Sequence, residues 1–251
     1  MGIAITSLVI ILVTLGTAFL SSVLGMLGGL ILIGLLVFLM PIQQAMILHG
    51  LIQLTSNGFR AWLNRKYISW RIVHMILIGN LCALIGFFSI NFVPDKITVI
   101  LVLGSLPYIA WALPKDSVLD ITKKPVGILA GASVVGSNII SGTGGLVLDT
   151  FFQRVRMTRH QVVATKAVAQ SLGHIAKIMF FGFLMTPTLT IWPSPWLITF
   201  AILSSVVGTT LGKKILDRID DGKFFLWTQR IILVLGALFI GYAIYMLKLS
   251  K

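Results

Sequence analysis

Two polar stripes at helical spacing interrupt this otherwise apolar chain. The second stripe carries Lys166, Gln170 and His174, spaced four residues apart, so a cation, an amide and an imidazole would share one face of a helix. Charges at membrane depth are costly and are normally paired or functional. The stripe could therefore bind an oxyanion, the alternative being a Lys166 side chain that extends along the helix to reach water.

The first stripe consists of His49, Gln53 and Asn57, again four residues apart. Buried polar groups need partners, so these side chains either line a site or hydrogen-bond between helices. Ser141 and Thr143 are weaker candidates, as hydroxyl donors in the segment that precedes the second stripe.

Asp149 is the only acidic residue expected deep in an apolar segment. It could pair with Lys166 across a hairpin, or it could carry the proton of a coupled transporter. The alternative is an ion pair that only fixes the geometry of the hairpin, and the roles are compatible.

A glycine pair precedes each stripe: Gly28 and Gly29 before the first, Gly144 and Gly145 before the second. Glycine permits a break in the helix, and a helix that starts after the break points free N–H groups at whatever lies before it. Such an end attracts anions. Close helix packing is the alternative, but two pairs at equivalent positions favour an anion site.

The composition predicts an all-α polytopic membrane protein. Of 251 residues, 57% are hydrophobic and only 11% are charged, whereas a soluble domain has about 25% charged residues. Spans are expected at 3–24, 70–92, 96–113, 125–141, 195–212 and 224–247. Stretches 27–63 and 144–185 are broken at Met40-Pro41 and at the basic segment 154–160. Each predicts a helical hairpin that either spans fully or re-enters, giving eight to ten membrane segments.

Chemistry other than transport is disfavoured. The chain has one cysteine (Cys82), four His and no Glu, which leaves no metal-ligand cluster and no cofactor motif, so we expect neither an enzyme nor a bound metal. No Walker A pattern is present. The net charge of +13 is concentrated in short loops, which disfavours nucleic acid as a partner and points to topology instead.

Matching motifs in the two halves predict a duplication, with a first repeat at 1–113, a linker at 114–124 and a second repeat at 125–251. The basic stretches 60–71, 114–124, 154–159 and 213–223 should all be cytoplasmic. They fall on one side if each half crosses an odd number of times, which inverts the second repeat. Paired inverted repeats with broken helices are typical of secondary transporters.

These motifs resemble the TauE/SafE sulfite exporter family of membrane permeases. The resemblance rests on Gly25–Gly29, Ser141–Gly145 and the segments Gln53–Asn57 and Gln170–His174. It implies a multi-pass inner-membrane transporter whose partners are the lipid bilayer and a small sulfur-containing oxyanion: sulfite, thiosulfate or an organosulfonate. Alternating access around a site at the glycine breaks is the expected mechanism. An anion channel and a permease for a non-sulfur anion are the alternatives, and a homodimer is left open.

Overall fold

The computed structural model describes residues 3–24, 27–90, 92, 94–112, 119–152, 155–184, 192–216 and 221–249. Over these ranges the chain is helical and forms no strand. The all-helical polytopic prediction is confirmed. Among the predicted features, Gly25, Met26, the 114–118 part of the linker, Arg154 and the 217–220 part of the last basic stretch lie outside the described residues.

The helices follow the predicted spans closely. The first half holds α1 (Ile3–Leu24), α2 (Leu27–Leu39), α3 (Ile42–Leu63), α4 (Trp70–Ser89) and α5 (Lys96–Ala112), with a short turn η1 (Arg65–Tyr67) before α4. The second half holds α6 (Lys124–Ser141), α7 (Gly145–Phe152), α8 (Arg159–Met179), a π-helical turn η2 (Phe180–Leu184), α9 (Pro195–Leu216) and α10 (Asp221–Leu249).

Five helices in the described part of the chain are long and apolar enough to cross a membrane: α1, α4, α8 with η2, α9 and α10. The short arms of the two predicted hairpins differ from these. With 13 residues, α2 rises about 20 Å, and α7 with eight residues rises about 12 Å. Neither covers a hydrocarbon core of about 30 Å. Each hairpin therefore joins a short arm to a full-length helix, α3 or α8.

Local sequence explains where the helices break. Pro41 separates α2 from α3, since proline removes a donor and disfavours helix before it. Thr158 caps α8 in a reciprocal capping box with Gln161. Gly142 ends α6 at φ +82°, a left-handed conformation that suits glycine, and its N–H donates to the Asn138 carbonyl.

Helix packing relates the two halves. α1 lies along α9, α4 lies along α6, α3 crosses α8, and α5 lies beside α10. In chain order, α1 corresponds to α6, α3 to α8, α4 to α9 and α5 to α10. Under this exchange the α1–α9 pair becomes the α6–α4 pair, while the α3–α8 and α5–α10 pairs are unchanged. A two-fold duplication would produce this pattern, and the division at residues 113 and 125 stays a prediction.

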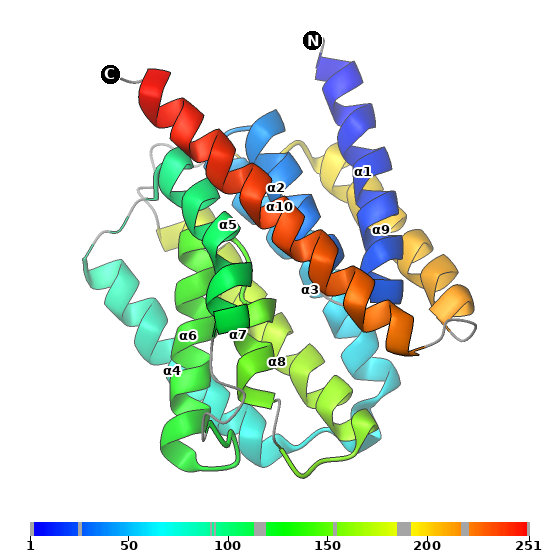
Figure 1. Cartoon of the computed structure of the whole chain (residues 1–251), viewed down its shortest axis with the longest axis vertical. Coiled ribbons are helices and arrows are strands. Elements are labelled where there is room, and N and C mark those ends of the chain that lie inside the picture. The colour runs from blue at the N-terminus through cyan, green and yellow to red at the C-terminus, as the bar shows by residue number, and fades with distance from the viewer. Residues whose placement is uncertain are drawn as a thin grey trace.

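The ends of the bundle can be followed in Figure 1. The starts of α4, α6 and α8 lie toward its lower end, next to the described parts of three basic stretches, while both termini lie toward the upper end. This common placement is what the predicted topology requires. Which end faces the cytoplasm stays a prediction.

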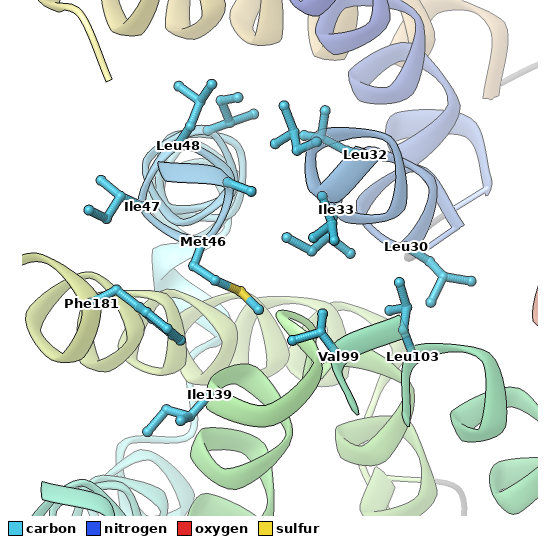
Figure 2. Close-up of a cluster of buried hydrophobic side chains, with 14 of the residues drawn as sticks. Leu30, Leu32, Ile33, Met46, Ile47, Leu48, Val99, Leu103, Ile139 and Phe181 are labelled. Carbon is cyan, nitrogen blue, oxygen red and sulfur yellow. The ribbon is translucent and has the colours of Figure 1, made fainter. Parts of the chain in front are cut away.

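The core surrounds α2, which is buried along most of its length. Figure 2 shows Leu30, Leu32 and Ile33 of α2 facing side chains from α3, α5, α6 and η2, including Met46, Val99, Ile139 and Phe181. Between helices in a membrane, such contacts stabilise by close packing rather than by removing surface from water. The start of α2, which carries the Gly28-Gly29 pair, is therefore held in a closely packed centre.

Candidate functional site

A pocket lies where α3 crosses α8, beside the starts of α2 and α7. It encloses about 360 Å³ of space not filled by atoms, including the part at its open mouth. Its lining residues come from both halves of the chain: Ser21, Gly29, His49, Gln53, Asn57, Arg60, Thr143, Gly145, Gln170 and His174.

Most of the predicted site residues gather here. The stripes on α3 and α8 face each other across the pocket because four-residue spacing keeps each set on one side of its helix. The side-chain amides of Gln53, Asn57 and Gln170 form no hydrogen bond with another described residue. They are free to bind a ligand. Gln53 packs against Gly29 because glycine has no side chain: a Cβ at Gly29 would lie 2.9 Å from Gln53 Nε2.

Gly28 and Gly144 do not line the pocket. A Cβ at Gly28 would meet the Thr17 carbonyl and the Ser21 hydroxyl, and one at Gly144 would meet Val134 and Asn138. The second glycine of the first pair, Gly29, borders the pocket, and so does the second glycine of the other pair, Gly145. At Gly28 and Gly144 the structure shows the close packing that was the alternative interpretation.

Lys166 also lies outside the lining. Its ammonium forms an ion pair with the Asp149 carboxylate, the partner expected from sequence. The two side chains are 23% and 33% exposed, so the pair is only partly buried. The direct role of Lys166 as a substrate ligand stays a prediction.

The hydroxyl candidates divide in the same way. Thr143 lines the pocket, but Ser141 turns inward and donates to the Ser137 carbonyl at 2.8 Å. Ser137 in turn donates to the Thr143 carbonyl. These bonds support the break between α6 and α7, and Ser141 is not among the residues that line the pocket.

Arg60 is a lining residue that the sequence analysis did not select. It was assigned to a basic stretch that orients the chain, because it lies near the end of its helix. The guanidinium forms no hydrogen bond or ion pair with another described residue. Among the lining residues it is the only Arg or Lys, and none is an Asp or Glu. The pocket therefore presents a positive charge that no lining carboxylate offsets.

Lys177 is the second residue that sequence reasoning missed. It is fully buried, and its Nζ lies 2.7 Å from His49 Nδ1 and 2.8 Å from the Gly142 carbonyl oxygen. It occupies the position in the second half that Arg60 occupies in the first. That match was visible in the sequence as part of the repeat, but nothing local indicated that either cation faced the centre.

His49 connects Lys177 to the pocket. Its Nε2 lies 3.0 Å from the Gly29 carbonyl oxygen, and its ring packs edge-on against His174 with centroids 5.6 Å apart. His174 is buried, and its Nδ1 has no hydrogen-bond partner in the described structure. One His thus bonds at both nitrogens, and the other keeps a free nitrogen beside the pocket.

The described residues contain no group of three or more His, Cys, Asp or Glu side chains that could hold a metal ion. The donors that line the pocket are amides, hydroxyls, imidazoles and one guanidinium. This set suits an anion, because amide N–H and guanidinium groups donate to oxygen atoms.

A helical bundle with several membrane-crossing helices, broken helices at its centre and a polar pocket between them defines a multi-pass membrane protein of the transporter class. A family model described as sulfite exporter TauE/SafE matches residues 10–246. The chain belongs to that family. No curated protein and no solved structure matched it in the same comparisons.

Proposed function

We propose that this protein is a secondary transporter that moves a small sulfur-containing oxyanion across the inner membrane, and that the pocket between α3 and α8 is its binding site. The observation that carries the proposal is the lining itself. Arg60, Gln53, Asn57 and Gln170 all reach the pocket without a hydrogen-bond partner among the described residues, and no Asp or Glu lines it.

The chemistry of these groups fits an oxyanion. A guanidinium offers a planar pair of N–H donors that bind two oxygens at once, and charge-assisted bonds of this kind are about twice as strong as neutral ones. The amides of Gln53 and Gln170 add neutral donors from opposite helices. The space of the pocket includes an open mouth, so water can reach a bound sulfite or thiosulfate ion, or a short sulfonate, and bridge it to the lining.

Alternating access follows from the placement of the pocket. It lies between the long arms of the two hairpins, α3 and α8, with the short arms α2 and α7 beside it. Rocking of one repeat against the other would open it to each side of the membrane in turn. We place the basic stretches 60–71, 114–124, 154–159 and 213–223 in the cytoplasm. Asp149, paired with Lys166, is the candidate for coupling to a proton.

The proposal is tested with purified protein in liposomes. Uptake of labelled sulfite, thiosulfate, sulfate, a sulfonate and a carboxylate is measured against concentration and against excess unlabelled anion. We expect saturable uptake and exchange for at least one sulfur oxyanion. Arg60→Gln should abolish most of it, and Arg65→Gln should not, because Arg65 is an exposed cation on the same side that lies over Trp62.

Three results would contradict the proposal. Conductance that rises with anion concentration without saturation would indicate a channel. Saturable transport of the carboxylate alone would indicate a permease for a non-sulfur anion. Equal loss of transport in Arg60→Gln and Arg65→Gln would remove the pocket from the mechanism.

A further inference from the structure

Lys177 is a buried amine behind the pocket with no carboxylate beside it among the described residues. Its side chain has no exposed surface, and both of its hydrogen-bond partners, His49 Nδ1 and the Gly142 carbonyl oxygen, are uncharged groups. Within the described residues Lys177 forms no ion pair. A buried charge without a counter-charge is costly, so whatever carries negative charge nearby will be held strongly.

The hydrogen bonds define which atoms carry protons. The Gly29 carbonyl oxygen can only accept, so His49 Nε2 carries a hydrogen and donates to it. Nδ1 of the same ring then has its lone pair free and accepts from the Lys177 ammonium. A neutral imidazole therefore lies between the cation and the pocket, and Lys177 acts on the pocket through its charge rather than by contact.

The charges around the pocket do not balance. Arg60 contributes one positive charge at the lining, and Lys177 contributes a second behind His49 when its amine is protonated. Lys166 and Asp149 cancel each other in their ion pair. The lining adds no Asp or Glu, so with Lys177 protonated the described site carries two positive charges, and a bound anion would stabilise that protonated form.

We propose that Lys177 is protonated when an anion occupies the pocket and thereby determines the charge preference of the site, so that the pocket selects a dianionic oxyanion over a monoanion of the same shape. This inference rests on the proposed anion transport and narrows its substrate class. Sulfite, thiosulfate and sulfate dianions meet the condition, whereas an alkanesulfonate, with a single charge, does not. Arg60 binds the anion directly, and Lys177 supplies the second unit of attraction.

The expected size of the effect follows from Coulomb's law. At an effective dielectric constant of about 20, two unit charges roughly twice as far apart as a contact ion pair of about 4 Å change the affinity by roughly tenfold to thirtyfold. Removing Lys177 should therefore weaken dianion binding about twice as much, on a logarithmic scale, as monoanion binding. The ratio of the two affinities is the diagnostic quantity.

The test measures dissociation constants for two pairs of anions that share a shape and differ by one charge: thiosulfate with methanesulfonate, and sulfate with perchlorate. The full-length protein is used in lipid nanodiscs. We expect the wild type to prefer the dianion in each pair. Lys177→Met should reduce that preference by roughly tenfold to thirtyfold, and Lys177→Arg should largely retain it.

Lys123→Met is the matched control, since it removes an exposed cation at the start of α6 and should leave the preference unchanged. If Lys177→Met does not fold, the wild type still decides, because equal affinity for thiosulfate and methanesulfonate overturns the inference. An unchanged ratio in folded Lys177→Met overturns it as well, even where transport itself is intact. Failure to bind any of the four anions would overturn the proposed function and the inference together.

Discussion

Asp149 on α7 and Lys166 on α8 form an ion pair that joins the two arms of the second hairpin, and neither side chain lines the pocket. The first half has Ile33 and His49 at the corresponding positions. His49 on α3 contacts Lys177, whereas the corresponding Lys166 on α8 pairs with Asp149. The two halves therefore differ: the second half has the Asp149–Lys166 ion pair, whereas in the first half His49 contacts Lys177.

The ion pair predicts a charge-swap result. Asp149→Asn leaves Lys166 partly buried without its partner and should lower the free energy of unfolding by about 1–3 kcal/mol, between the values for exposed and buried pairs. Asp149→Lys combined with Lys166→Asp should recover most of the thermal stability but not the transport, because the coupling carboxylate then lies on α8 instead of α7. Unfolding temperature in detergent and liposome uptake measure the two effects. Recovered transport in the swapped protein would contradict the coupling role of Asp149 and leave the pair a purely structural role.

Arg60 is expected to set the affinity of the pocket. Arg60→Gln should raise the KM for the transported anion by roughly tenfold to hundredfold, because hydrogen bonds to a charged group contribute about 1.5–3 kcal/mol. Arg60→Lys should retain part of the affinity, having the charge without the paired donors. Initial rates in liposomes over a range of anion concentrations separate KM from kcat. A fall in kcat at constant KM would contradict a binding role.

The first glycine pair allows packing and site roles to be separated. Gly28→Ala places a methyl group against the Thr17 carbonyl and should destabilise the fold by about 1–3 kcal/mol. Gly29→Ala meets only the flexible end of Gln53, so it should impair transport with little loss of stability. Gly16→Ala is the control, with no atom within 4 Å of the added carbon. Equal loss of stability in Gly28→Ala and Gly16→Ala would refute the packing role.

Asp95 gives a pH-dependent prediction outside the membrane-spanning segments. Its carboxylate accepts a hydrogen bond from the Thr98 hydroxyl and from the N–H groups of Thr98 and Ile97, and these bonds hold the pKa of Asp95 below its ordinary value. The contribution to stability is then complete above pH of about 4 and is lost as the pH falls through the lowered pKa.

Asp95→Ala should therefore lower the unfolding temperature at neutral pH, and the difference from wild type should shrink in acid. Asp95→Asn keeps a capping oxygen and should show a smaller loss at neutral pH. Thermal unfolding of the three proteins in detergent across the acidic range provides the measurement. A difference that grows as the pH falls would have the wrong sign.

Membrane orientation is tested by labelling single cysteines in a Cys82→Ser background. Lys96→Cys lies at the start of α5 and Lys123→Cys lies just before α6, at opposite ends of neighbouring segments. A membrane-impermeant maleimide added to intact cells should label Lys96→Cys, and it should label Lys123→Cys only after the membrane is opened. Cys82→Ser alone provides the background. The opposite labelling pattern would reverse the proposed topology.

The sequence predicted the helices and both stripes because those signals are local. Apolar length and Pro41 define helix ends, and four-residue spacing places Gln53 with Asn57 and Gln170 with His174 on single faces. These features depend only on neighbours within a few turns, so they survive folding unchanged.

The positions of Arg60 and Lys177 at the centre could not be predicted in the same way. How deeply a side chain is buried, and which residues it contacts, depend on packing between helices that are distant in sequence. Lys166 and Lys177 lie on the same helix, yet one forms a partly exposed ion pair and the other is completely buried against α3. In the sequence, Arg60 belongs to a basic stretch that indicates membrane topology. It lines the pocket only because α3 crosses α8.

The central position of α2 has a consequence for the order in which this protein can be assembled. Gly34 of α2 lies directly beneath the ring of Phe239, so one side of the second helix is covered by α10. During synthesis, roughly 200 residues emerge from the ribosome between these two contacting groups, and at about 5–20 residues per second that takes at least ten seconds. Until then this face of α2 must be shielded by lipid or by the insertion machinery, so a nascent chain arrested before α10 should be a favoured target for membrane quality-control proteases.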